Sequence, residues 1–162
     1  MPEGAPGRPR PTSGVSTSIQ EGTHPSLAVE TTTRDGASGF LSVLVRDYLA
    51  DGLGLGTDHA AGVSLRLAVT EALTNVVRHA YPEGKTGPVR LELFVEKETL
   101  VVRLQDHGPC FDPNSSTAEL PSPEELAEGG YGIPILRQVM DSIDHSWTEQ
   151  SGNVLTLRKR LP

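Results

Sequence analysis

Apolar and polar residues alternate with a period of two in the middle and near the end of the chain. From residue 89 to 95, Val and Leu occupy every second position, and the same phase resumes in residues 100–104 after a short turn. This alternation predicts two antiparallel strands joined as a hairpin. Residues 143–149 and 154–160, which flank a Ser-Gly-Asn sequence, are predicted to pair as a closing hairpin. The β-branched residues in the segment 27–33 predict an edge strand.

Apolar residues at helical spacing predict three helices. The first covers residues 39–50, and a glycine-rich loop follows it. The second is long, because Thr57 or Asp58 can cap its start and its apolar stripe reaches about Ala80, before Pro and Gly residues end it. The third covers residues 133–140, where a proline in the first turn is compatible with the start of a helix.

The composition predicts one domain with an N-terminal tail. Residues 1–25 are rich in Pro, Gly, Ser and Thr and carry almost no large apolar side chains, so they cannot offset the entropy cost of ordering. Residues 26–162 are expected to form the domain, because a chain of 162 residues has room for little more than one. With 36% apolar residues its core is modest but sufficient for independent folding.

The charge and the cysteine content argue against several classes of function. The formal net charge is −7 at pH 7, and no cluster of Lys and Arg is long enough to follow a phosphate backbone, so nucleic acid is not expected as a partner. The single cysteine, Cys110, excludes an intrachain disulfide and suits a reducing compartment. The sequence has neither an apolar stretch of the about 18 residues that a membrane span needs nor a leader. We therefore expect a cytoplasmic protein with no membrane partner.

The long helix carries the first candidate chemical residues. Glu71 and Asn75 are one helical turn apart, so their side chains project from the same face, beside the apolar stripe. A carboxylate there can act as a general base, and an amide oxygen can coordinate Mg²⁺. A solvated glutamate and a surface asparagine are the alternative interpretation, but asparagine is a poor helix former. Arg78 either faces the same ligand or is a surface charge near the helix end.

Two glycine-containing segments supply the other parts of a nucleotide pocket. Asp106 falls on the inward phase of its strand and Gly108 follows it, which places a side-chain acceptor beside an open backbone. An adenine amino group needs such an acceptor. Gly130 and Gly132 open the third helix, where unpaired N–H groups and the helix dipole favour phosphate oxygens. Each segment alone is compatible with an ordinary turn, whereas their order predicts a site for ATP and Mg²⁺.

These segments resemble the motifs of the GHKL ATPase superfamily, to which gyrase, the histidine kinases and MutL belong. Residues 71–81 are similar to its N box, residues 106–108 to its first glycine box and residues 130–132 to its second. Within the superfamily, the chain is most similar to the small bacterial anti-sigma-factor serine kinases, because Glu-Ala-Leu-Thr-Asn is followed by His-Ala-Tyr. The resemblance covers roughly residues 27–161.

The resemblance implies a fold and partners. The fold is an α+β two-layer sandwich, a Bergerat fold, whose mixed, mostly antiparallel sheet is covered on one face by helices. ATP would lie between the sheet and a lid at residues 113–128. In that family the phosphate acceptor is a serine of an anti-sigma-factor antagonist, and the unphosphorylated antagonist competes with a sigma factor for the kinase. Members are typically dimeric, so the resemblance also implies a homodimer.

The resemblance also implies a role for each candidate residue. Glu71 corresponds to the general base, Asn75 to the Mg²⁺ ligand and Asp106 to the acceptor for adenine. The positions at which the backbone approaches the nucleotide correspond to Gly108, Gly130 and Gly132.

Two features depart from the family pattern. Cys110 or Phe111 stands where the first glycine box usually has a second glycine, and residues 112–128 contain five acids and no Lys or Arg. Phosphoryl transfer depends on neutralising the charge of the γ-phosphate. Candidates for a cation from elsewhere are Arg78, Lys85 and Arg137. Three hypotheses follow: an ATP–Mg²⁺-dependent serine kinase, a regulatory module that binds ATP and a partner without phosphoryl transfer, and an ATPase without a protein acceptor.

Overall fold

The structure, a computed structural model, describes residues 16–20, 24–56, 58–110 and 132–162. Its strands are β1 (Ser16–Gln20), β2 (Ser26–Thr32), β3 (Pro88–Glu96), β4 (Thr99–Asp106), β5 (Ser142–Thr148) and β6 (Gly152–Arg160). Its helices are α1 (Ala37–Asp47), the short π-helix η1 (Tyr48–Gly52), α2 (Ala60–His79) and α4 (Gly132–Val139).

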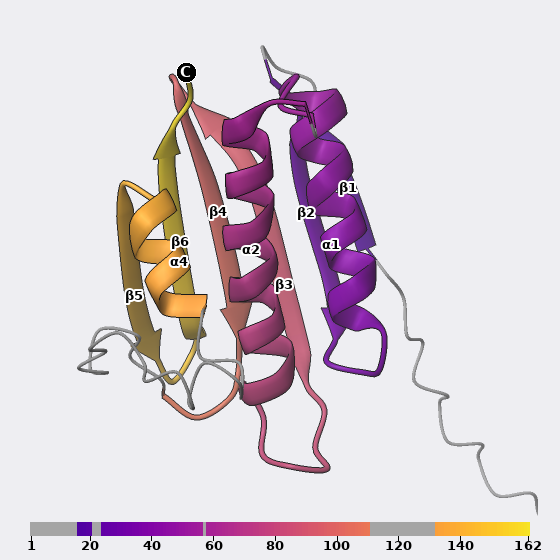
Figure 1. The fold of residues 1–162 in the computed structure, drawn as a ribbon. Coiled ribbons are helices and arrows are strands. Elements are labelled where there is room, and N and C mark those ends of the chain that lie inside the picture. The colour runs from indigo at the N-terminus through magenta and orange to yellow at the C-terminus, as the bar shows by residue number, and fades with distance from the viewer. Residues whose placement is uncertain (1–15, 21–23, 57, 111–131) are drawn as a thin grey trace, which may run out of the picture.

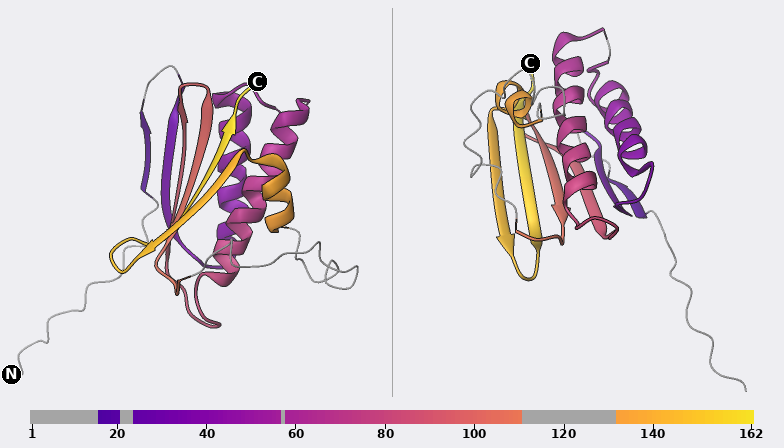
Figure 2. Two further views of the ribbon diagram at one scale, coloured as in Figure 1. Left: turned by 90° about the vertical axis from the view of Figure 1, so that its left-hand side faces the viewer. Right: turned by 60° about the horizontal axis from the view of Figure 1, so that its bottom comes forward.

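The strands form one sheet with helices on one face. The order is β1-β2-β3-β4-β6-β5, and each neighbouring pair of these strands is antiparallel. Helices α1, α2 and α4 lie side by side over the sheet, with α2 in the middle (Figure 1). The two turned views show the helical layer and the sheet as separate layers (Figure 2). This arrangement confirms the predicted α+β two-layer sandwich with helices on one face. The sheet is antiparallel at every described pairing and not mixed, because β6 separates β4 from β5, which run in the same direction.

Both predicted hairpins are confirmed, and their register explains the alternation in the sequence. In the β3–β4 hairpin, Leu91 pairs with Leu104 and Leu93 with Val102. All four side chains are buried beneath the helices. Because successive strand residues point to opposite faces, the polar residues between them reach the outer face of the sheet.

The N-terminal part of the sheet corrects two expectations. Residues 16–20 form β1, although the segment 1–25 is expected from its composition to be a tail. Because β1 pairs with β2, the strand β2 is an inner strand and not the predicted edge strand. An edge strand needs backbone hydrogen bonds on one side only, so it can form without large apolar residues. Composition therefore does not reveal it.

The start of α2 differs from the predicted cap. His59 is the N-cap residue and makes no side-chain cap hydrogen bond, so a cap by Asp58 is wrong; Thr57 lies outside the described residues. The preceding loop folds back onto the first turn, where a Cβ added to Gly62 would overlap the carbonyl oxygens of Leu55 and Gly56. Close packing of the backbone, and not a side-chain cap, therefore defines this helix start.

The core lies between the helices and the sheet. Leucines from α1, η1, α2, β3, β4 and β6 meet there. Those with almost no exposed surface are Leu41, Leu49, Leu65, Leu73, Leu91, Leu93, Leu100, Leu104 and Leu157. Each such side chain contributes about 1.5–3 kcal/mol through burial, which fixes α2 on the sheet and with it the residues at its C-terminal end.

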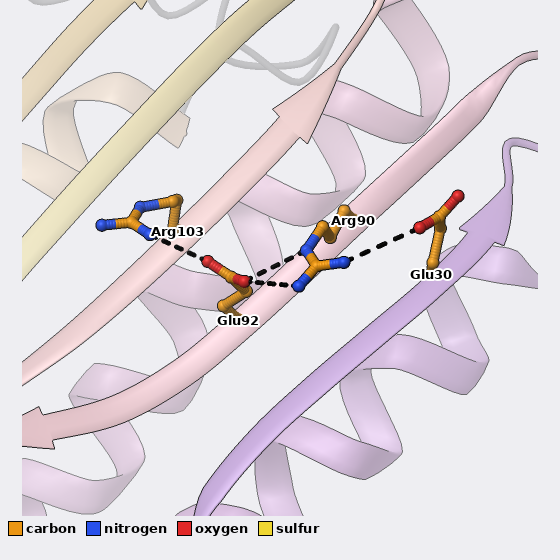
Figure 3. Close-up of polar contacts among 4 residues, drawn as sticks. All are labelled: Glu30, Arg90, Glu92 and Arg103. Carbon is orange, nitrogen blue, oxygen red and sulfur yellow. Dashed lines mark hydrogen bonds and ion pairs between the residues drawn. The ribbon is translucent and has the colours of Figure 1, made fainter. Parts of the chain in front are cut away.

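The outer face of the sheet carries a row of alternating charges (Figure 3). The Arg90 guanidinium bonds Glu92 at 2.7 Å, and Arg103 bonds the other oxygen of Glu92 at 3.0 Å. Glu30 on β2 extends the row, with 3.8 Å to Arg90. Burial alone would raise the pKa of Glu92, but hydrogen bonds and charges from both arginines outweigh it and lower that pKa. The row confirms that the outward phase of these strands is polar.

Candidate functional site

The C-terminal half of α2 presents Glu71 and Asn75. Both side chains are half-buried, and they lie one helical turn apart on one face. The neighbouring positions Ala72 and Leu73 are buried and pack the helix onto the core. α2 also contacts α4 and β4, so both polar side chains belong to a helix that is fixed on two sides.

Strand β4 ends in a buried carboxylate at Asp106. Its side chain is 5% exposed, as expected for the inward phase. The Oδ1 atom accepts two hydrogen bonds, one from the backbone N–H of Gly108 at 2.9 Å and one from Nδ2 of Asn153 at 3.0 Å. Both donors are neutral, so they hold the carboxylate in place without cancelling its charge.

Asn153, at the start of β6, is a site residue that the sequence analysis missed. It pairs with Asp106 in the β4–β6 register, and its Nδ2 also donates to the carbonyl oxygen of Pro109 at 2.8 Å. Because Nδ2 faces acceptors, Oδ1 of Asn153 faces Nε2 of His145 at 3.1 Å, and that nitrogen acts as the donor. In the sequence, Asn153 has the same inward phase as Leu155 and Leu157, and a polar side chain that points inward needs a hydrogen-bond partner. This pattern could have identified Asn153.

Two glycines allow the backbone around Asp106 to pack closely. A Cβ added to Gly108 would overlap the carbonyl oxygen of Ala80, which is the C-cap of α2. Gly152 has a φ of 66°, and a Cβ there would overlap the carbonyl oxygen of Asp106. The loop after β4 therefore touches the end of α2 directly. This contact brings the predicted residues of the helix and of the strand into one region.

Tyr81 adds a second connection in this region. Its hydroxyl accepts a hydrogen bond from the backbone N–H of His107 at 2.9 Å and donates one to the carbonyl oxygen of Pro88 at 2.7 Å. Desolvation and the negative charge of Asp106 raise the pKa of Tyr81 and outweigh the opposite effect of the His107 hydrogen bond. The hydroxyl therefore stays protonated and able to donate at neutral pH.

The third predicted segment is described only in part. Gly132 is the first residue of α4, and α4 packs against α2 and β5. Gly130, Phe111 and the expected lid at 113–128 lie outside the described residues. Arg78 and Arg137, two of the candidate cations, are both exposed, near the C-terminal ends of α2 and α4 respectively; Lys85 is exposed in the loop before β3.

The described residues contain no group of three or more His, Cys, Asp or Glu side chains that could hold a metal ion. Cys110 is exposed and follows the loop that Asn153 holds. The buried carboxylate, the backbone at Gly108 and the helical amide form a set of acceptors and donors suited to a polar organic ligand.

Together the sheet, the helical layer and the buried aspartate at the end of β4 define an ATPase-type domain. A family model described as a histidine kinase-like ATPase domain matches residues 28–159, and the chain belongs to this family. The domain is therefore an ATP-binding, kinase-like domain.

Three curated bacterial relatives share the name serine-protein kinase RsbW. The protein from Bacillus subtilis is 38% identical over 85 residues, which cover 49% of this chain and 53% of the relative. The one from Listeria innocua is 31% identical over 108 residues, 62% of this chain and 68% of the relative. The one from Halalkalibacterium halodurans is 35% identical over 103 residues, 60% of this chain and 61% of the relative.

The chain thus spans about half the length of the Bacillus subtilis kinase that it matches. The similarity relates this chain to the RsbW serine-protein kinases. Separately, none of the helices among the described residues is long and apolar enough to span a bilayer.

Proposed function

We propose that this chain is an ATP–Mg²⁺-dependent protein serine kinase of the anti-sigma-factor type. Its substrate would be a serine of an anti-sigma-factor antagonist, and in the absence of that antagonist it would sequester a sigma factor. The names of the RsbW relatives support a serine kinase, and the anti-sigma role and the homodimer extend the family resemblance. The observation that carries the proposal is the buried Asp106, held by neutral donors beside the end of the helix that bears Glu71 and Asn75.

Asp106 is suited to bind adenine. Both hydrogen bonds that described residues donate to it end on Oδ1, so we expect Oδ2 to be the acceptor for the exocyclic amine. Guanine carries a carbonyl oxygen at that position and would meet the carboxylate with repulsion. The close packing of Gly108 on the carbonyl of Ala80 fixes the backbone beside Asp106. We therefore expect selectivity for ATP over GTP.

The donor set also fits Mg²⁺ that arrives with the nucleotide. Asn75 offers one amide oxygen, and the described residues hold no carboxylate cluster that would bind the ion alone. Mg²⁺ commonly keeps waters and phosphates as its other ligands, and when bound it neutralises phosphate charge. We expect Asn75 to hold the ion, Gly130 and Gly132 to let the backbone approach the phosphates, and Glu71 to accept the hydroxyl proton of the substrate serine.

The second candidate function is a regulatory module that binds ATP and a protein partner without transferring phosphate. It is favoured by the five acids and the absence of Lys and Arg in residues 112–128. In this case ATP would change the affinity for the partner, and Glu71 would have no chemical role. The two functions share the nucleotide site, so they differ in the fate of the γ-phosphate.

Calorimetric titration tests the shared site. The wild-type chain should bind ATP more tightly with Mg²⁺ than without it, and should bind GTP weakly. Asn75→Ala should remove the Mg²⁺ dependence, whereas Asp106→Asn should weaken ATP binding with or without Mg²⁺. Glu96→Ala, at the opposite end of β3, is the matched control and should bind like the wild type. A wild-type chain that binds no ATP would contradict both candidate functions.

Transfer of labelled γ-phosphate to the antagonist protein of the same organism separates the two functions. Glu71→Ala should bind ATP with nearly unchanged affinity and lose transfer by about 10²-fold or more, the scale of general-base catalysis. Equal transfer by the wild type and Glu71→Ala would exclude Glu71 as the base. ATP binding with no transfer by the wild type would favour the regulatory module.

A further inference from the structure

The predicted residues for adenine and for Mg²⁺ come from different elements, and few contacts join these elements near the site. Asn75 lies on α2, whereas Asp106 ends β4. Among the described residues, the contacts between the chain beyond the end of α2 and the loop after β4 include the following two. One is the packing of Gly108 on the carbonyl of Ala80, and the other is the hydroxyl of Tyr81.

The hydroxyl of Tyr81 bridges the start of β3 and the loop after β4. It accepts from the N–H of His107, the residue directly after Asp106, and donates to the carbonyl of Pro88, the first residue of β3. A tyrosine hydroxyl can do both at once because it is a donor and an acceptor. Phenylalanine could fill the same space and could make neither bond. The bridge therefore depends on a single oxygen atom.

The ring of Tyr81 packs against the backbone of Gly87. A Cβ added to Gly87 would overlap the ring, so ring and backbone are in close contact. Gly87 is itself held by Thr33, at the end of β2: its N–H donates to the Thr33 hydroxyl at 3.1 Å, and its carbonyl accepts from the Thr33 N–H at 2.9 Å. Thr33 is buried. The sheet thus fixes the ring, and the ring fixes the hydroxyl.

We propose that Tyr81 is a positioning residue that ties the end of α2 to the loop after β4 and so sets the offset between Asn75 and Asp106. This inference rests on the proposed function, in which one ATP molecule spans both residues. A ligand that contacts two elements binds more tightly when their separation is fixed before binding, because it does not bear the entropy cost of aligning them. Tyr81 would contact neither the metal nor the reacting atoms.

The key variant is Tyr81→Phe, with Tyr48→Phe as its matched control. Tyr48 also donates a hydroxyl hydrogen bond to a backbone carbonyl, that of Pro25 at 2.7 Å, but it lies in η1 and is buried in the core. Tyr81→Phe should raise the Kd for Mg²⁺-ATP about three- to tenfold, the net effect expected from losing its two water-accessible hydrogen bonds. Because the groups released at His107 and Pro88 are accessible to water, its Tm should stay near that of the wild type. Tyr48→Phe should lower Tm and leave the Kd unchanged.

Adenosine provides a readout that a purely structural role would not change. It can reach Asp106 but has no phosphates to bring toward Asn75, so Tyr81→Phe should weaken adenosine binding less than Mg²⁺-ATP binding. Gly87→Ala keeps the hydroxyl but displaces the ring, and it should shift the two affinities in the same direction as Tyr81→Phe.

The possible outcomes separate the inference from the function on which it rests. If the wild type binds no ATP, the proposed function fails and the inference fails with it. If the wild type binds ATP and Tyr81→Phe binds it equally well, only the inference fails. Equal losses for adenosine and Mg²⁺-ATP would also overturn it, because they would limit the role of Tyr81 to the adenine side. A larger loss for Mg²⁺-ATP supports it.

Discussion

Charged residues on the two faces of the sheet have different hydrogen-bond partners. On the outer face, Glu92 is held between two arginines, and the whole row is accessible to solvent (Figure 3). On the helix face, Asp106 is buried and receives its hydrogen bonds from an amide side chain and a backbone N–H. Charges on the outer face neutralise one another, whereas both described donors to Asp106 are neutral and hold its carboxylate at a fixed position. We therefore expect Asp106, and not Glu92, to be the carboxylate that accepts a hydrogen bond from a ligand.

Among the variants that test this contrast, Gly108→Ala should have the largest effect. The new Cβ would overlap the carbonyl of Ala80, so the loop or the end of α2 must move. We expect a loss of about 3 kcal/mol in the free energy of unfolding, the upper end of the range for overpacking, together with loss of ATP binding. Gly39→Ala in α1 is the control, because no atom lies within 4 Å of its added Cβ. Urea unfolding and calorimetry of both variants measure the difference.

The second variant, Asn153→Ala, tests one of the two neutral donors to Asp106. It removes a hydrogen bond from the buried Asp106 and should cost about 1–3 kcal/mol of stability, and it should also weaken ATP binding. Gln105→Ala is matched to it, because Gln105 is on the neighbouring position of β4 and donates to the carbonyl of Ser151 at 2.8 Å. If Gln105→Ala weakened ATP binding as much as Asn153→Ala, the contrast between the two faces would not hold.

Glu92→Gln should have the smallest effect, which appears in the pH dependence of stability. Because the pKa of Glu92 is lowered in the folded state, its charged form stabilises the fold above the ordinary value of 4.5. This contribution is lost as the pH falls through the lower, folded-state pKa. The wild type should therefore lose up to about 1 kcal/mol on acidification that Glu92→Gln does not lose.

Glu30→Gln is the control on the same row. Its pair with Arg90 is long, at 3.8 Å, and its side chain is 55% exposed, so its pH profile should match the wild type within about 0.5 kcal/mol. Thermal unfolding of the three proteins from neutral to acid pH provides the comparison. A profile of Glu92→Gln identical to that of the wild type would show that the outer row does not contribute to stability.

The hairpins and helices were predictable because their signals are local. The alternation in residues 89–104 and the apolar stripe of α2 each follow from burial on one face, and the structure confirms both. Strand β1 was not predictable from composition, because its pairing with β2 depends on backbone hydrogen bonds and not on its side chains. The order of the strands was not predicted, because it depends on pairings between segments that are distant in sequence.

In the candidate site, too, some residues were predictable from the sequence and others were not. Glu71, Asn75 and Asp106 were identified because each departs from the chemistry expected at its position in a helix or strand. Asn153 was missed because its partner is distant in sequence and only the β4–β6 register brings them together. The roles given to all the candidate residues stay predictions: Glu71, Asn75, Asp106, Gly108, Gly130 and Gly132. Gly130 lies outside the described residues.

The pairing of β2 with β3 bears on the order in which the chain folds. Thr32 pairs with Pro88, and both α1 and α2 lie between them in the sequence, so this pairing closes a long loop. The β3–β4 and β5–β6 hairpins close over short turns and should form first. The contacts of Thr33 with Gly87, on which Tyr81 rests, are made at the late pairing. During refolding, the recovery of ATP binding should therefore lag behind hairpin formation and report completion of the whole domain.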